Sequence, residues 1–328
     1  MAASRSGQRT AYLAAEGFFD ELIDELKIAR IPIAFEHGYL IVTDRPPINA
    51  AWAMNTWYNC ERVAVSSISD ASAKLRSKQR NWALYAVEHR GRAELIAQKL
   101  PHVSAKPLPF GHAAPTARLG SWTLLDQNTM LVAAKCSSPF ANGAPQFVED
   151  REGPPNRAYL KLWESLCLLR NFPKPGERCL DLGASPGGWT WSLAQTGATV
   201  LAYDKAPLDP AVDALPNVTW HGESAFGLEP NDVGAVDWWC SDIIGYPERV
   251  LRLVEKWLDH ATNIVCTIKF QGETDHDIAH RFAAIPNSRV VHLFHNKHEL
   301  TFLRPGPATP PALADPSATA DNQPGDSQ

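Results

Sequence analysis

The stretch from Cys179 to Pro207 reads CLDLGASPGGWTWSLAQTGATVLAYDKAP and decides the fold of the chain. A short apolar run ends in a turn that contains three glycines and a proline, and a second apolar run ends on Asp204. Glycine carries no Cβ atom, so such a turn lets backbone N–H groups approach a ligand closely. A turn of this kind after the first strand of an open α/β sheet lies beside the ligand site, beyond the carboxyl ends of the strands.

The spacing of the glycines distinguishes between classes of ligand. Gly183 is followed by Gly187 and Gly188, which gives G-x-x-x-G-G and not the G-x-G-x-x-G of dinucleotide-binding enzymes. This spacing argues against a nicotinamide dehydrogenase and fits an S-adenosylmethionine site, in which no pyrophosphate has to be held. The carboxylate of Asp204 is suited to accept hydrogen bonds from two ribose hydroxyls. Taken alone, the turn is equally compatible with a tight strand-to-helix connection that binds nothing.

The sequence around this turn alternates strand and helix patterns as far as Arg304. Apolar strand patterns lie at 178–183, 199–205, 217–223, 236–242, 263–270, 288–295 and 298–304. Helical patterns lie at 161–170, from 189 onward, at 247–261 and at 276–285. Strands and helices in regular alternation predict an α/β fold with a mostly parallel sheet that helices cover on both faces.

The N-terminal part shows a different pattern, which is typical of a small α+β domain. We expect strands at 10–15 and 37–43, helices at 17–29, 48–57 and 92–100, and a hairpin at 121–134. Residues 137–155 are rich in Pro, Gly, Ser and Asn, as expected for a connector. The expected domains are therefore 1–145 and 146–304, and we expect the Pro- and Ala-rich tail, 305–328, to be disordered.

Composition and charge exclude several classes of protein. The six cysteines form no CxxC pair and no zinc-like spacing with histidine, so no metal site is expected. The sequence has no signal peptide pattern and no apolar run of membrane-spanning length, and we expect a cytoplasmic monomer that binds no membrane. Residues 1–148 hold 16 Lys and Arg against 12 Asp and Glu, whereas residues 149–304 hold 15 against 21. This asymmetry indicates a polyanion partner for the first half, although ordinary surface scatter would also produce it.

Four charged residues stand where a buried core would favour apolar side chains. Asp242, Lys269 and Glu299 lie at or near the ends of apolar strand patterns, and Lys161 lies on the preceding helix. A charge isolated in such a place costs several kcal/mol unless it is paired. Each residue alone is explained by a strand end that reaches solvent or by a wet helix face. Together they are two cations and two anions at the same sheet edge as the glycine turn, which predicts a functional cluster.

Five segments resemble the successive motifs of a known family. They are RAYLKL (157–162), DLGASPGGWT (181–190), CSDIIGYPERV (240–250), TIKFQG (267–272) and LFHNKHELTFL (293–303). Over about residues 155–304 the chain resembles the FtsJ-type RNA ribose 2′-O-methyltransferases. Within them it is most similar to the RlmM type, which modifies a cytidine of large-subunit (23S) ribosomal RNA. The resemblance implies a Rossmann-like, S-adenosylmethionine-dependent methyltransferase domain.

By this resemblance, Lys161, Asp242, Lys269 and Glu299 match the family's Lys-Asp-Lys-Glu tetrad, with Lys269 as the general base. The chemistry needs such a group, because a ribose hydroxyl is a poor nucleophile and a free lysine, with a pKa of about 10.4, is protonated at neutral pH. We expect a second ammonium and partial burial to lower the pKa of the base. Lys161 and Lys269 would flank the hydroxyl, with Asp242 between the cofactor and the base and Glu299 fixing Lys161.

The resemblance also implies the contacts of the cofactor. Asp204 would bind the ribose, and Asp242 would lie near the methionine amino group or the sulfonium. The turn around the methionine part would comprise Gly183, Ser185, Pro186, Gly187, Gly188 and Trp189.

Two positions depart from the family pattern. Ser224, preceded by Glu223, stands where an Asp usually contacts the adenine, so one of these two residues would accept from the adenine amino group. Asn156 and Ala158 replace the serines that flank Arg157 in the RlmM type. The resemblance therefore implies that Arg157 contacts RNA, but it implies no contact between a serine of this loop and the cofactor.

A basic run in the first domain indicates a surface for RNA. Lys74, Arg76, Lys78 and Arg80 occur at every second position, as expected for an RNA-backbone contact or for a solvated face. RlmM-type enzymes carry a ferredoxin-like domain with a THUMP module here, and the first domain of this chain is shorter than that arrangement. Trp189 and Tyr246 belong to loops at strand ends, where an aromatic side chain can stack on a base.

The sequence leaves two functions open. The first is S-adenosylmethionine-dependent 2′-O-methylation of a ribose in RNA, with ribosomal RNA as the partner. The second is an RNA-binding or ribosome assembly factor that retains the fold without turnover. The paired lysines argue against the second function, because a binding module has no use for them in a buried place.

Overall fold

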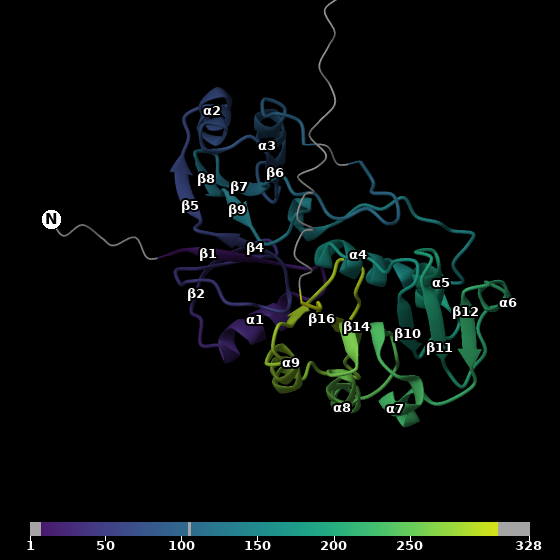
Figure 1. Cartoon of the computed structure of the whole chain (residues 1–328). Helices are drawn as coiled ribbons and strands as arrows, with labels where there is room; N and C mark the ends of the chain where they lie inside the picture. Colours follow the sequence, from purple (N-terminus) through teal and green to yellow (C-terminus); the bar gives the residue numbers. More distant parts are fainter. Residues whose placement is uncertain (1–7, 104–105, 308–328) are drawn as a thin grey trace, which may run out of the picture.

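The computed structural model describes residues 8–103 and 106–307 of the chain. These residues form three β-sheets with helices packed against them (Figure 1). The first two sheets, which we call the N-terminal region, lie on one side of the molecule. The third sheet and its helices, which we call the C-terminal region, lie on the other. The tail predicted to be disordered, 305–328, lies outside the described residues from position 308 onward.

The first sheet has five antiparallel strands in the order β2-β3-β1-β4-β9. Its strands are β1 (Thr10–Ala14), β2 (Ile33–His37), β3 (Leu40–Thr43), β4 (Ala53–Tyr58) and β9 (Lys135–Cys136). Helix α1 (Phe19–Ile28) lies where a helix was predicted, and it is followed by β2, which was not predicted. The order of the first four strands matches a ferredoxin-like βαββαβ unit, but the described residues 44–52 contain no second helix.

The helix predicted for residues 48–57 is wrong, because residues 53–58 form β4 instead. β4 pairs with β1 and places Trp57 in the core between the first two sheets. Just before β4, the buried carboxylate of Glu25 accepts hydrogen bonds from the backbone N–H groups of Ala51 and Trp52, at 2.7 and 3.0 Å. Strand pairing and this carboxylate outweigh the helix propensity of the alanines, which is a weak local preference.

The second sheet has four strands in the order β5-β8-β7-β6. Its strands are β5 (Glu61–Ala64), β6 (Trp82–Leu84), β7 (Gly120–Asp126) and β8 (Thr129–Ala133). β7 and β8 form the predicted hairpin, and β6 runs parallel to β7. Helices α2 (Ile68–Lys78) and α3 (Arg90–Ala97) pack on this sheet through Leu75 and Ile96, which share a core with Trp122.

The third sheet has seven strands in the order β12-β11-β10-β13-β14-β16-β15. β10 to β14 are parallel, and β16 is inserted antiparallel between β14 and β15. The strands are β10 (Arg178–Leu182), β11 (Thr199–Tyr203), β12 (Val218–His221), β13 (Val236–Ser241), β14 (Ala261–Lys269), β15 (Arg289–Val291) and β16 (Glu299–Arg304). The predicted α/β fold with a mostly parallel sheet is confirmed.

Helices cover both faces of this sheet, because side chains that alternate along each strand form two separate apolar cores. α4 (Tyr159–Leu169) and α5 (Gly188–Ala194) pack on one face, with Leu166 and Leu193 against Cys179 and Trp238. α8 (Pro247–Trp257) and α9 (His276–Ala283) pack on the other face. Shorter helical turns complete the C-terminal region at α6 (Pro210–Asp213), η2 (Ala225–Gly227) and α7 (Pro230–Val233), whereas η1 (Ala141–Gly143) contacts β4 and β6 of the N-terminal region.

The N-terminal region packs directly on the segment that precedes β16. The indole of Trp52, fully buried, stacks on the rings of His292 and His298 with centroids 5.1 and 5.8 Å apart. The backbone N–H of His292 donates to the carbonyl of Ala51 at 2.6 Å. One apolar core therefore continues from the first sheet into the third, and it fixes the approach of the chain to Glu299.

The described residues contain no disulfide and no helix suited to span a membrane. All six cysteines are free thiols, and every one of them except Cys136 is buried. No helix in the ranges 8–103 and 106–307 combines the length and the hydropathy needed to cross a bilayer.

Candidate active site

A cavity of about 550 Å³ opens at the carboxyl ends of the parallel strands. The loops after β10, β11, β12 and β13 and the end of β14 all contribute to its wall, which is where open α/β sheets bind ligands. Its lining residues are Asn156, Ala158, Gly183, Ala184, Ser185, Gly188, Trp189, Asp204, Lys205, Ser224, Ala225, Phe226, Asp242, Ile243, Ile244, Arg249 and Lys269.

The glycine turn forms the floor of this cavity, and two of its glycines are required by close contacts. Gly183 has a φ of +77°, and a Cβ atom there would lie 2.8 Å from the side chain of Ile243. A Cβ atom on Gly188 would lie 2.3 Å from Oδ1 of Asn156. Pro186 and Gly187 complete the turn but do not line the cavity. Of the predicted cofactor residues in the turn, four therefore reach the cavity and these two do not.

The carboxylate of Asp204 connects the end of β11 to this turn. Its Oδ2 accepts a hydrogen bond from the backbone N–H of Ser185 at 3.1 Å, and its Oδ1 accepts from the N–H of Ala206 at 2.9 Å. Both bonds orient the carboxylate while it still lines the cavity. Ser224 also lines the cavity, whereas its neighbour Glu223 does not, so Ser224 is the better placed of the two alternatives.

The loop before α4 closes one side of the cavity. Asn156 accepts from the N–H of Ala158 through Oδ1 at 2.9 Å, and the indole N–H of Trp189 donates to the carbonyl of Ala158 at 2.9 Å. Asn156 lines the cavity at a position where sequence comparison indicated only a lost serine contact. A short polar side chain in a turn before a helix was the available signal, because such residues bond to the backbone nearby.

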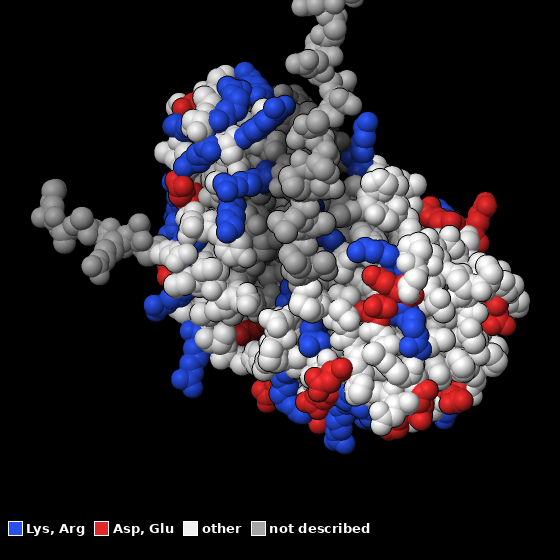
Figure 2. Space-filling view, in the orientation of Figure 1, with Lys and Arg blue, Asp and Glu red and all other residues white. Residues whose placement is uncertain are grey.

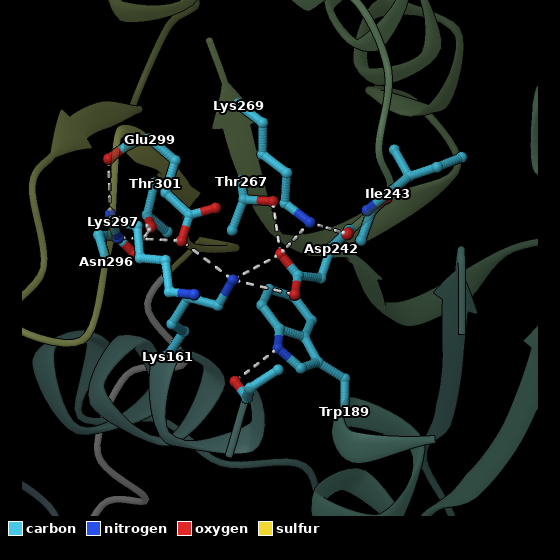
Figure 3. Close-up of polar contacts among 12 residues, drawn as sticks. Lys161, Trp189, Asp242, Ile243, Thr267, Lys269, Asn296, Lys297, Glu299 and Thr301 are labelled. Carbon is cyan, nitrogen blue, oxygen red and sulfur yellow. Dashed lines mark hydrogen bonds and ion pairs between the residues drawn. The ribbon is translucent and has the colours of Figure 1, made fainter. Parts of the chain in front are cut away.

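The four charged residues of the predicted cluster meet beside the cavity (Figure 3). Nζ of Lys161 lies 2.8 and 3.0 Å from the two carboxylate oxygens of Asp242, and 3.0 Å from Oε1 of Glu299. Nζ of Lys269 lies 3.0 Å from Oδ1 of Asp242 and also donates to the backbone carbonyl of Asp242. Asp242 is therefore bonded to both amines.

Further polar contacts hold the two carboxylates in place. The hydroxyl of Thr267 donates to Oδ1 of Asp242 at 2.8 Å. The backbone N–H of Lys297 donates to Oε1 of Glu299 at 3.3 Å, and the side-chain amide of Asn296 donates to the carbonyl of Glu299 at 3.1 Å. Thr267 was not identified from the sequence. The signal was present, since Thr267 precedes Lys269 by two residues in β14 and the two side chains point to the same face.

The two lysines have different environments. Burial of Lys161 disfavours its ammonium, but the carboxylates of Asp242 and Glu299 outweigh that penalty and hold the pKa of Lys161 above its usual value. The direction for Lys161 was not predicted from the sequence, because it follows from the two anions that contact this amine. Lys269 lines the cavity and Lys161 does not. Lys269 is thus the member of the pair that a ligand in the cavity can reach.

A further carboxyl group lies beneath the cavity and was not identified from the sequence. Asp181, in β10, is 1% exposed, and its Oδ2 accepts from the hydroxyl of Thr190 at 2.7 Å. Its Oδ1 has no hydrogen-bond partner among the described residues. Burial raises the pKa of Asp181 to about 7. An aspartate inside the apolar run CLDLG was the signal for this residue.

The predicted RNA-contacting residues of the first domain do not form one row. Lys74, Arg76 and Lys78 belong to α2, where residues two positions apart point in different directions. Lys74 pairs with Asp70 at 2.8 Å, and Arg76 donates to a backbone carbonyl of the α3 end at 2.7 Å.

The last two residues of this set lie in a separate groove. Lys78 and Arg80 line a second cavity of about 610 Å³, at the junction of the first two sheets, together with Arg118 and Lys135. None of the residues that line this groove is an Asp or a Glu. Lys78 also pairs with Glu61 at 2.8 Å.

Arg157 lies in the loop before α4 and is paired with an acid of the connector. Its Nε and Nη2 donate to the two carboxylate oxygens of Glu149 at 3.1 and 2.7 Å, while the arginine side chain is 71% exposed.

The described residues, 8–103 and 106–307, contain no group of three or more His, Cys, Asp or Glu side chains that could hold a metal ion.

The region around the cavity of about 550 Å³, which we call the main cavity, is similar to known proteins. Residues 154–294 match a family model described as FtsJ-like methyltransferase. The C-terminal region is similar to this family over these residues. The matched residues of the FtsJ-like region include the glycine turn, Asp242, Lys269 and Lys161, and they end just before Glu299.

Curated relatives of the FtsJ-like region carry the name ribosomal RNA large subunit methyltransferase M. The relative from Halorhodospira halophila is 41% identical over 120 residues, 36% of this chain and 34% of its own length. Relatives from Marinobacter nauticus and Thauera aminoaromatica are 29% identical over 206 and 212 residues, which is 54% and 59% of this chain and 55% and 56% of theirs. The chain thus matches about half the length of these relatives or less.

Replacement of Asp181 by asparagine tests its environment through the pH dependence of stability. Because the folded-state pKa, about 7, exceeds the usual value of about 3.9, the folded chain retains a proton that the unfolded chain has lost. The contribution of Asp181 to the free energy of unfolding therefore falls as pH rises from about 4 to about 7. In urea denaturation across this window, the change in the free energy of unfolding per pH unit should be more positive in Asp181→Asn than in the wild type, by about 1 kcal/mol.

The exposed residue Asp259 provides the control for this measurement. Asp259→Asn should leave the slope of the wild type unchanged. Equal slopes in Asp181→Asn and in the wild type would mean that the Asp181 carboxyl does not carry the extra proton.

Proposed function

We propose that this protein transfers a methyl group from S-adenosylmethionine to a ribose 2′-hydroxyl of RNA, namely a cytidine of large-subunit (23S) ribosomal RNA. The observation that carries the proposal is the amine of Lys269, which lines the cavity while two bonds to Asp242 fix it. The family of the C-terminal region and the names of the curated relatives support the reaction and the substrate class. The rest of the proposal concerns what each residue of this chain does.

The residues of the main cavity fit S-adenosylmethionine. A volume of about 550 Å³ lies within the usual range of small-molecule sites, about 300–1,000 Å³. The backbone of the glycine turn and Trp189 would hold the methionine part, and the carboxylate of Asp204 would accept from the ribose hydroxyls. Ser224 would meet the adenine amino group. When bound, the cofactor supplies a methyl group on a positively charged sulfur.

Lys269 acts as the general base once its ammonium has released a proton. A neutral amine has two N–H groups and one lone pair, and the two N–H groups can donate to the carboxylate and the carbonyl of Asp242. The lone pair is then left for the 2′-hydroxyl. During transfer the ribose oxygen forms its bond to the methyl carbon, the bond from that carbon to sulfur breaks, and the hydroxyl proton passes to Nζ of Lys269.

Lys161 acts as a permanent cation behind the base. Its raised pKa keeps it protonated, and its contacts with Asp242 and Glu299 hold the Asp242 carboxylate against Lys269. Lys161 and Glu299 are positioning residues in this scheme, because neither lines the cavity.

Substitution of Lys269 by methionine tests the proposed reaction. The variant keeps most of the aliphatic length of the side chain but has no amine, so methyl transfer should fall by about 10²- to 10⁴-fold. The assay uses large-subunit ribosomal RNA from a strain that lacks the gene, with labelled S-adenosylmethionine and mass spectrometry of the nuclease digest. Loss of one 2′-O-methylcytidine in that strain and its restoration by the purified protein are the expected results.

Lys256, a partly exposed lysine of α8 that pairs with Glu229 at 2.7 Å, provides the matched control. Lys256→Met should transfer methyl groups at the wild-type rate. A wild-type protein that restores no methyl group to any RNA would favour the alternative, an RNA-binding assembly factor without turnover. Normal transfer by Lys269→Met would exclude Lys269 as the base.

We further propose that the groove at the junction of the first two sheets binds the RNA backbone. Lys78, Arg80, Arg118 and Lys135 bring four positive charges to a groove without acids. Figure 2 shows Lys and Arg gathered over the N-terminal region, whereas acids are more frequent over the C-terminal region. Arg157 would join this surface by exchanging its carboxylate partner Glu149 for a phosphate.

The salt dependence of RNA binding tests this groove. Each phosphate contact contributes about 0.7–0.9 to the slope of log affinity against log salt concentration, so the double variant Arg80→Gln, Arg118→Gln should reduce the slope by about 1.5. Arg252→Gln, an exposed arginine of α8, serves as the control and should bind as the wild type does. An unchanged slope in the double variant would exclude the groove.

A further inference from the structure

Two large apolar side chains project from the loop that follows β13, beside the proposed catalytic amine. Ile244 is 79% exposed and Tyr246 is 64% exposed. They have the highest exposed fractions of the large apolar side chains among the described residues, where the next value is 56%, at Val148. Isolated apolar residues on a surface need no explanation, but two such residues on one loop at the rim of a cavity mark a site of interaction.

The backbone of this loop is firmly held. The carbonyl of Tyr246 accepts from the N–H groups of Arg249 and Val250 at 2.9 and 3.2 Å, at the start of α8. Pro247, at the first helical position, restricts the backbone there further. The backbone at Tyr246 is thus held by hydrogen bonds while the side chain of Tyr246 remains exposed to solvent.

The loop packs closely on the residues beneath it, so it has no space to move toward the core. A Cβ atom on Gly245 would lie 2.9 Å from the ring of Phe226. The guanidinium of Arg249 lies over that ring, 4.2 Å from its centroid. Phe226 and Arg249 both line the main cavity, so the same contacts that shape the cavity support the loop.

The loop is also tied directly to the proposed base. Lys269 donates to the backbone carbonyl of Asp242, which is the residue where the loop begins. A chain advances at most about 3.6 Å per residue, so the Cα atom of Ile244 lies within about 7 Å of that of Asp242. In a nucleotide, the base is attached to the carbon next to the one that bears the 2′-hydroxyl. A ribose placed at Lys269 therefore brings its base to this loop.

We propose that Ile244 and Tyr246 form a platform on which the base of the target nucleotide stacks. The inference rests on the proposed function, because it assumes that the ribose at Lys269 belongs to RNA. The platform offers an aromatic face and an aliphatic side chain and has no charged group. It therefore contacts the face of the base, which is accessible only in a single-stranded or extruded nucleotide. Stacking holds the nucleotide in one orientation, and the 2′-oxygen then faces the amine.

Binding of oligocytidylate, measured by fluorescence anisotropy without the cofactor, tests the platform independently of methyl transfer. Stacking on one aromatic side chain contributes enough that Tyr246→Ala should bind about 5- to 100-fold more weakly. Tyr246→Phe retains the ring and should bind as the wild type does, and Ile244→Ala should show a smaller loss than Tyr246→Ala. An abasic oligomer of the same length should bind the wild type and Tyr246→Ala equally.

Controls separate the platform from general effects of exposed apolar residues and from the proposed function. Ile28→Ala removes an exposed isoleucine of α1, 49% exposed, and should leave binding unchanged. Equal binding of oligocytidylate by Tyr246→Ala and the wild type would overturn the platform. The platform would also be overturned if Tyr246→Ala lost S-adenosylmethionine binding while its RNA binding stayed unchanged. A protein whose binding responds to Tyr246→Ala but which methylates no RNA would refute only the proposed function.

Discussion

The pairing of one carboxylate, Asp242, with two lysine amines is the interaction on which the site depends. Two partly buried ammonium groups repel each other, and burying each of them costs several kcal/mol unless an anion compensates. Asp242 compensates both, and Glu299 adds a second anion to Lys161. Removing Asp242 would leave Lys161 with Glu299 alone and would take from Lys269 its carboxylate partner, so this residue has the least freedom to vary.

The architecture brings these four side chains together from distant parts of the chain. Asp242 follows β13, Lys269 ends β14, Glu299 begins the antiparallel β16, and Lys161 lies on the covering helix α4. β14 and β16 pair Lys269 directly with Glu299 in register.

The segment before β16 receives support from two other sides. On α4, Glu164 is 2% exposed and accepts from the backbone N–H groups of Phe294 and His295 and from the ring of His295. Trp52 of the N-terminal region stacks on the same segment. The N-terminal region thus contributes to the geometry of the site as well as to the proposed RNA surface.

Much of this arrangement could be predicted from the sequence, and the exceptions have physical reasons. The parallel sheet follows from the local alternation of strand and helix patterns, and Asp242, Lys269 and Glu299 follow from charges at strand ends, which are also local. Residues 48–57 were mistaken for a helix, because the decisive contact comes from Glu25 in another element. The direction of the Lys161 pKa shift depends on distances to two carboxylates, and a sequence does not contain distances.

The protonation of Lys161 tests the central claim most directly. It can be followed by ¹³C NMR of protein labelled at the lysine Cε atoms, with the Lys161 signal assigned by its loss in Lys161→Arg. The account predicts that Lys161 remains an ammonium beyond the usual lysine pKa of about 10.4, and that Asp242→Asn shifts its titration to lower pH. Titration of Lys161 near neutral pH in the wild type would show that burial outweighs the carboxylates, and it would contradict the account.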